Sequence, residues 1–292
     1  MFAKLLAVVV AGAMLLGAAT AQTISREEYQ KQLDQRRIEI DAMSRDDDPM
    51  GWAKAQSDFG RRLYAFDSVD EAIAAYRQAL EVYSRDATPK EWAATEEFIG
   101  SAYRRQASMK ATVGLFVMLG GGMPGSRSSG PPDITADVSG ALQAFAAAQE
   151  VYTRVDFPGD WVRMELQQGL THSLLSQSRG SDDTAAQEHR DAATARFNNV
   201  LVYTDAPTDH MWRAIAHQGL VSLNEHGFEN ETERIRFALD HAKLAKVEFT
   251  AAGEAEQAER MDRQISSLEY HLKHAEEYVP GELDSIFGAR QN

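Results

Sequence analysis

A short pattern of residues recurs along the chain and constrains its fold more than any other feature. The segments 81–92 and 150–161 both begin with Glu-Val-Tyr, carry a proline three residues before their end, and end in tryptophan. The same Tyr-to-Trp spacing joins Tyr203 to Trp212, and a copy with methionine in place of the tyrosine ends at Trp52. A recurring unit of this kind predicts one supersecondary element stacked several times.

Each tryptophan is followed by a glycine at a nearly constant distance. The glycine lies eight residues on in three copies and seven residues on in the fourth, at Gly60, Gly100, Gly169 and Gly219. Because glycine has no Cβ, it permits two backbones to approach closely. Small and aromatic residues then follow at matching offsets in two copies, as Ala72, Tyr76 and Ala79 and as Ala141, Phe145 and Ala148.

These positions resemble the tetratricopeptide repeat family. The elements Phe59-Gly60 and Ile99-Gly100, with Tyr103, look like its Leu-Gly-x-x-Tyr motif. The resemblance covers about residues 50–249, and the proline ahead of a tryptophan-led helix is similar to the long-linker variety found in bacterial repeat proteins. It implies an all-α fold, in which about ten helices form hairpins that stack into a right-handed superhelix.

Hydrophobic periodicity predicts helices independently of this resemblance. Apolar residues from Ile73 to Tyr83 recur at steps of three and four residues, as an amphipathic helix requires. The predicted helices include 25–43, 50–65, 69–85, 90–107 and 137–153, and a polar helix over 255–278 that caps the stack. We find no alternating pattern that predicts strands.

The N-terminal residues are typical of an export signal. Lys4 precedes an apolar run over 5–18, and Ala19-Thr20-Ala21 supplies the small residues that a signal peptidase needs. We therefore expect residues 1–21 to be removed before Gln22, leaving 22–292 as a single repeat domain that is periplasmic or secreted.

Composition excludes several classes of function. The formal net charge of −14 argues against nucleic acid as a partner, since phosphate binding needs a basic footprint. Without cysteine, disulfides and thiolate metal sites are excluded. The sequence contains no phosphate-binding glycine loop and no His-Glu-x-x-His motif, so we expect neither an enzyme nor a cofactor.

The histidines give one weak metal hypothesis. His271 and His274 are three residues apart, which places both on one face of the predicted terminal helix, with Glu277 one step further along. Zinc needs a third ligand in the same geometry, so ordinary solvated or core imidazoles are the alternative. Other histidines, such as His172, His217 and His241, are scattered over different repeats.

The resemblance also implies a binding face. In similar proteins, ligands lie along the first helix of each hairpin, at fixed offsets from its glycine. Here those offsets select Lys54, Arg61, Tyr64, Arg104, Arg105, Arg163 and Arg213. Arginine pairs bidentately with carboxylates, so we expect a protein or extended peptide in the inner groove, with an acidic segment or a free C-terminus. The alternative is that these cations are solvated and pair with acids on their own helices.

An insertion interrupts the second repeat. The distance from Gly100 to Ala141 exceeds the repeat's need by about 29 residues, and the added segment, 106–135, holds an apolar stretch over 111–119. One interpretation is an apolar finger that contacts a membrane or a membrane protein, which would make the protein an envelope-attached spacer. The other is that the stretch extends the preceding helix, ahead of a loop rich in glycine, serine and proline.

Overall fold

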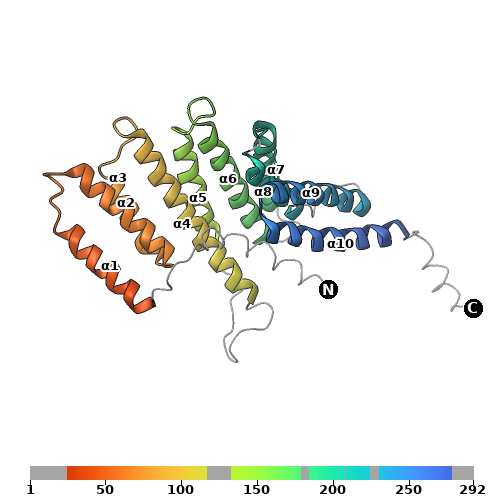
Figure 1. Cartoon of the computed structure of the whole chain (residues 1–292), viewed down its shortest axis with the longest axis horizontal. Coiled ribbons are helices and arrows are strands. Elements are labelled where there is room, and N and C mark those ends of the chain that lie inside the picture. Colours follow the sequence, from red (N-terminus) through yellow and green to blue (C-terminus); the bar gives the residue numbers. More distant parts are fainter. Residues whose placement is uncertain (1–24, 117–132, 179–183, 207, 224–229, 278–292) are drawn as a thin grey trace, which may run out of the picture. The chain divides into compact units, whose positions relative to one another are not determined.

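The computed structural model describes residues 25–116, 133–178, 184–206, 208–223 and 230–277 (Figure 1). Every regular element in these ranges is an α-helix, which confirms the predicted all-α class and the expected number of about ten helices. The helices are α1 (Arg26–Asp41), α2 (Pro49–Ala65), α3 (Val69–Leu80), α4 (Pro89–Phe116), α5 (Thr135–Gln149), α6 (Pro158–Ser178), α7 (Thr184–Tyr203), α8 (His210–Ser222), α9 (Glu231–Ala251) and α10 (Ala255–Glu277). The predicted signal peptide, 1–21, lies outside the described residues.

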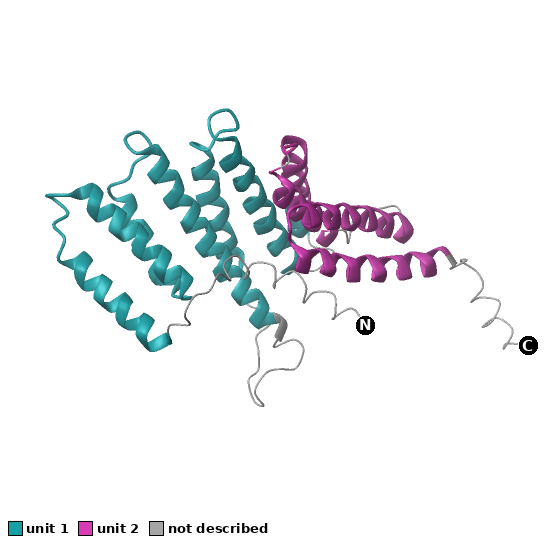
Figure 2. Cartoon of the chain, viewed as in Figure 1, with its two compact units in different colours: residues 1–189 teal, residues 190–292 magenta. Residues whose placement is uncertain are grey.

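The chain divides into two compact units, Met1–His189 and Arg190–Asn292 (Figure 2). In the first unit, each helix from α1 to α6 packs on its neighbour in sequence. The contact between α1 and α2 is the weakest of these. In the second unit, α9 packs on both α8 and α10. Packing between chain neighbours is what an array of helix hairpins requires.

The recurring Tyr-Pro-Trp pattern forms the same turn three times in the first unit. In each turn, a hydroxyl oxygen accepts a hydrogen bond from the backbone N–H three residues on, at 3.1 or 3.2 Å; the pairs are Ser44 with Asp47, Ser84 with Ala87, and Thr153 with Asp156. The next helix then begins with a proline, whose missing N–H costs no helical hydrogen bond at that position. The repeated sequence therefore encodes a repeated turn between hairpins.

The repeated glycines let the two helices of a hairpin touch. A Cβ on Gly60 would meet the ring of Tyr76 at 2.5 Å, and one on Gly100 would meet the ring of Phe145 at 2.7 Å. The second unit differs, because Gly219 lies against Phe197 of the preceding helix α7 rather than against the following one. The glycine contact thus persists in the second unit, while the helix that provides its aromatic partner changes.

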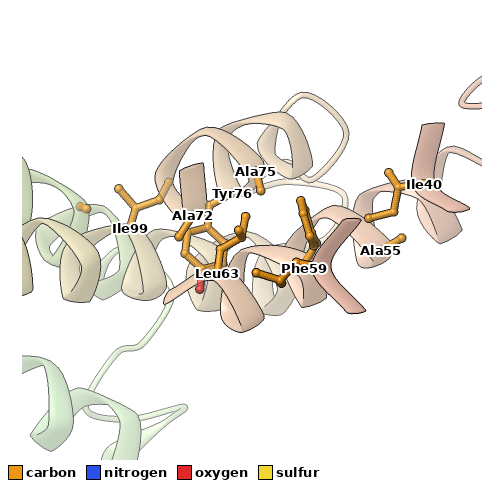
Figure 3. Close-up of a cluster of buried hydrophobic side chains, with 10 residues drawn as sticks. Ile40, Ala55, Phe59, Leu63, Ala72, Ala75, Tyr76 and Ile99 are labelled. Carbon is orange, nitrogen blue, oxygen red and sulfur yellow. The ribbon is translucent and has the colours of Figure 1, made fainter. Parts of the chain in front are cut away.

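The core of the first hairpin gathers around the Gly60 contact. Figure 3 shows Phe59 and Leu63 of α2 beside Ala72 and Tyr76 of α3, all of them buried. Burying an aliphatic or aromatic side chain of this size contributes about 1.5–3 kcal/mol. This apolar packing leaves the opposite side of α2 for polar residues.

Three predicted helix ends were wrong by four residues or more. The helix predicted over 137–153 is α5, which ends at Gln149. We expected a helix over 69–85, but α3 ends at Leu80, because the residues after it form the turn that leads to Pro89. We expected the next helix to end at 107, but α4 continues to Phe116. That extension agrees with the second interpretation of the insertion as far as Phe116, and 117–132 lie outside the described residues.

Candidate functional site

Helices α2, α4 and α6, each the first helix of a hairpin, form one layer in the first unit, because α4 contacts both of the others. Two contacts give the register of this layer. The guanidinium of Arg61 on α2 lies 5.6 Å from the ring centroid of Phe98 on α4, and Arg163 on α6 pairs with Glu97 on α4. When positions are counted from the glycine of their own helix, each contact joins a residue to one whose position is three lower on the next helix.

Two predicted binding residues on α2 pair within their own helix. Lys54 Nζ lies 2.8 Å from Asp58 Oδ2, and Arg61 binds the other carboxylate oxygen of Asp58. Both side chains are exposed, at 72% for Lys54 and 56% for Arg61. Burial alone raises the pKa of Asp58, but the hydrogen bonds from these two cations outweigh burial and lower it. Such pairs are what the alternative of solvated cations predicts.

Tyr64 and Arg105 connect α2 to α4. The guanidinium of Arg105 lies 4.8 Å from the ring centroid of Tyr64 and donates a hydrogen bond of 3.2 Å to the Tyr64 carbonyl oxygen. Arg105 also pairs with Asp67, which follows α2. The charge of Arg105 is therefore compensated inside the protein.

Arg163 is held in a bidentate ion pair between α6 and α4. Its Nε and Nη2 donate to the two carboxylate oxygens of Glu97 at 2.6 and 2.7 Å, and Asp160 lies 2.7 Å from Nη2. Burial alone lowers the pKa of Arg163, but the hydrogen bonds and the charge of Glu97 outweigh burial and raise it. This geometry is typical of a structural clamp between helices.

Arg213 occupies a similar clamp in the second unit. Its Nε donates to Glu248 at 2.8 Å, and its Nη1 donates to the Thr204 carbonyl oxygen at 2.8 Å. The other carboxylate oxygen of Glu248 lies 2.6 Å from His210 Nδ1. Burial alone raises the pKa of Glu248, and its hydrogen bond with His210 and the charge of Arg213 together lower it.

Arg104 differs from every other predicted binding residue. Its Nε is buried and has no hydrogen-bond partner in the described residues. The residue as a whole is partly exposed, and it forms no ion pair in the described residues either. Burial lowers the pKa of Arg104, and the nearby phenol of Tyr64 opposes that shift. Buried polar atoms normally have partners, so Arg104 is the strongest candidate contact for a ligand.

A second buried atom, which the sequence did not indicate, shares this property. Gln167 Oε1 on α6 has no hydrogen-bond partner in the described part of the chain. Gln167 lies two residues before Gly169, an offset that the family resemblance did not select. No sequence signal separates it from Gln168, which donates a hydrogen bond of 2.7 Å to Gln149.

The structure pairs histidines that we expected to be scattered. His172 and His189 join α6 to α7, with 2.7 Å between their Nδ1 atoms, and His217 and His241 join α8 to α9, with 2.8 Å between theirs. In each pair, one Nδ1 donates and the other accepts, because a hydrogen bond needs both roles. Burial, assisted by His241, lowers the pKa of His217 to about 4.

The terminal histidines lie on the predicted helix, α10. His274 Nδ1 is 2.7 Å from the Tyr270 carbonyl oxygen, and the ring of Tyr270 contacts the rings of both His271 and His274. Within the residues described, we find no group of three or more histidine, aspartate or glutamate side chains arranged to hold a metal ion.

The described part of the apolar insertion carries exposed side chains. Met109 is 46% exposed and Val113 is 58% exposed, both in the last turns of α4. In the part of the chain that the structure describes, no helix combines the length and the apolar character that crossing a bilayer requires.

Comparisons with known proteins add no assignment. No protein-family model matches this chain, and no curated protein matches its sequence. The tetratricopeptide resemblance therefore stays a prediction.

Proposed function

We propose that this protein is an exported scaffold, with no catalytic activity, that binds an extended segment of another protein along the layer of α2, α4 and α6. The observation that carries the proposal is the side chain of Arg104 on the central helix of that layer, whose buried Nε has no hydrogen-bond partner in the described residues. Burying a polar atom without a partner costs free energy. A partner that supplies a carboxylate or a carbonyl oxygen would remove that cost on binding.

The acidic character of the chain limits the kinds of partner that it can bind. With a net charge of −14, the protein repels most acidic proteins at long range. An acidic segment or a free C-terminus must therefore be recognised through a local contact with a cationic side chain such as Arg104. Because this attraction is electrostatic, affinity should fall as salt increases.

The test is to capture partners from envelope extracts with the wild-type protein and with Arg104→Met. Methionine keeps an unbranched apolar side chain but removes the charge. Lys31→Met is the matched control, since the side chain of Lys31 is 67% exposed on α1 and pairs with Glu27 of the same helix. We expect a partner that is lost from Arg104→Met alone, with helicity by circular dichroism unchanged. Equal recovery by all three proteins would contradict binding at this layer.

Export is tested separately, by sequencing the N-terminus of the protein recovered from the periplasm or the medium. The proposal predicts that this chain begins at Gln22. A chain that stays in the cytoplasm and retains Met1 would refute export and would leave the binding layer to be tested by itself.

A second candidate function is an envelope-attached spacer, which the exposed Met109 and Val113 favour. Glutamine is a good helix former, so the double variant Met109→Gln/Val113→Gln should keep the helix while it removes the apolar contact. Under this function, the variant should leave the membrane fraction on flotation while the wild type stays. Identical fractionation of the two proteins would eliminate it.

A further inference from the structure

A cavity of about 250 Å³ lies between α1, α2 and α3 in the first unit. All three helices contribute apolar walls to it, and Figure 3 shows Ile40 of α1 and Phe59 of α2 among them. Sites for drug-sized ligands span about 300–1,000 Å³, so this cavity is smaller than the usual small-molecule site. Its size suits a single long side chain.

Gln56 provides the buried polar group of this cavity. It lines the cavity from α2 and is only 6% exposed. Its side-chain amide forms no hydrogen bond with the described residues, yet neither of its polar atoms is sealed from the surface, in contrast to Arg104 Nε. Buried amides normally have partners. Gln56 therefore offers an acceptor and a donor to whatever enters the cavity.

The corresponding position on α6 shows why the amide of Gln56 has no internal partner. Gln56 and Glu165 both lie four residues before the glycine of their helix. Ile40 and Gln149 both lie four residues before the hydroxyl residue of the preceding turn. Gln149 donates a hydrogen bond of 2.8 Å to Glu165. Ile40 has no polar atom in its side chain, so it cannot do the same for Gln56.

The charged residues of the cavity are more acidic than basic. Arg37 of α1 and Glu71 of α3 line it and form an ion pair with each other. Asp41 follows Arg37 by four residues and also lines the cavity, but its carboxylate has no ion pair or hydrogen bond in the described residues. One carboxylate is therefore left over, in an exposed position where a cation can reach it.

A lysine side chain matches this combination better than other side chains do. Its carbon chain can lie on Ile40 and Phe59 while its ammonium donates to Asp41 and to Gln56 Oε1. An acidic side chain would meet two carboxylates, and an apolar one would leave the amide unsatisfied. The net charge of −14 also attracts basic partners at long range.

We propose that the cavity between α1, α2 and α3 binds a lysine side chain from a basic segment of a partner protein, with Asp41 and Gln56 as the acceptors of its ammonium. This inference goes beyond the proposed function, because the cavity includes none of the residues that the family resemblance selected. The two contacts can therefore be tested separately.

The test uses two tripeptides, acetyl-glycyl-lysyl-glycinamide and its analogue with norleucine, which has the same carbon chain without the ammonium. Each is titrated into the ¹⁵N-labelled protein while the side-chain amide resonance of Gln56 is followed by NMR. We expect saturable shifts with the lysine peptide. We expect about tenfold weaker binding of the norleucine peptide, because it cannot donate to Asp41 or Gln56. This preference should shrink as salt increases.

Variants separate the charge from the cavity. Asp41→Asn should lose most of the preference for lysine, because the unpaired carboxylate is gone. Asp34→Asn is the matched control and should keep the preference, since Asp34 is an exposed residue of the same helix that accepts from Gln30 at 3.1 Å. Ala74→Leu fills the cavity from α3 and should abolish the shifts caused by both peptides. Leucine is a good helix former, so helicity by circular dichroism should not change.

Three results would overturn the inference. The first is equal binding of the two tripeptides to the wild type, and the second is the absence of any saturable shift. The third is a lysine-dependent shift that survives Ala74→Leu, because it would place the binding site elsewhere. None of these results bears on partner capture by Arg104→Met, so the proposed function is decided independently.

Discussion

Two arginines of the first unit, Arg163 on α6 and Arg104 on α4, are in opposite states. Arg163 donates two hydrogen bonds to Glu97, at 2.6 and 2.7 Å, and contacts Asp160. Arg104 has a buried Nε with no partner in the described residues. The supply of acids explains the difference, because two carboxylates surround Arg163, whereas the ionisable neighbour that acts on Arg104 is the phenol of Tyr64.

This difference separates two roles of buried charge. A fully paired arginine fixes the position of one helix against another, and its loss leaves a carboxylate unpaired. An unpaired arginine contributes nothing of this kind and is retained at a cost to stability. We therefore expect substitutions at the two positions to change stability in opposite directions.

The largest expected effect on stability comes from substituting Arg163, the paired arginine. Arg163→Met leaves Glu97, whose side chain is only 13% exposed, without its partner. We expect the free energy of unfolding to fall by about 3 kcal/mol, measured by urea denaturation. Lys54→Met is the control, because its pair with Asp58 is solvated, and it should change stability by less than about 0.5 kcal/mol. If both variants cost the same, Arg163 is not a clamp.

The neutral pair of His217 and His241 in the second unit predicts a stability that depends on pH. His217 has a pKa of about 4 in the folded protein, below the ordinary value of 6.5, because burial penalises its charged form. Below pH 6.5 the unfolded chain binds a proton that the folded protein excludes, so stability should fall as pH drops from about 6.5 to 4 and then level off. The loss attributable to His217 is up to about 3 kcal/mol.

Thermal or urea denaturation at a series of pH values measures this effect. His217→Gln should flatten the decline between pH 6.5 and 4. His271→Gln, at an exposed position on α10, should leave the decline unchanged. A decline that persists in His217→Gln would show that other groups cause it.

A smaller effect tests whether α4, which carries Arg104 and the partner of Arg163, is packed tightly against α5. A Cβ on Gly100 would meet the ring of Phe145 at 2.7 Å, so Gly100→Ala should destabilise the protein by about 2 kcal/mol. A Cβ on Gly159 would meet nothing within 4 Å, so Gly159→Ala should be neutral or slightly stabilising. Equal stabilities of these two variants would show that α4 can shift, which would weaken the comparison of the two arginines.

Local sequence predicted much of the fold because local interactions determine it. The hydroxyl side chains at Ser84 and Thr153 and the prolines that follow them determine the turns, so the pattern that revealed the repeat also marks helix starts. The end of α3 at Leu80 was missed because apolar periodicity continues to Tyr83, a buried residue of the turn. Hydrophobic spacing alone does not distinguish a last helical turn from a buried turn residue.

The candidate site was predicted only in part, because pairing depends on residues that are distant in sequence. The offset from Gly100 selected Arg104, and the offset from Gly169 selected Arg163, with nothing to tell them apart. Their difference arises from Glu97, which lies 66 residues before Arg163 in the chain. Gln167 was missed for the same reason, since the lack of a partner for its Oε1 is a property of the packed helices.

The most direct test of the account is the stability of Arg104→Met in the absence of any partner, measured by urea denaturation beside the wild type. Removing a guanidinium whose buried Nε has no partner should raise the free energy of unfolding by about 1–2 kcal/mol, even though the same variant loses binding. A fall in stability similar to that of Arg163→Met would contradict the account, because it would mean that Arg104 is held by interactions within the fold.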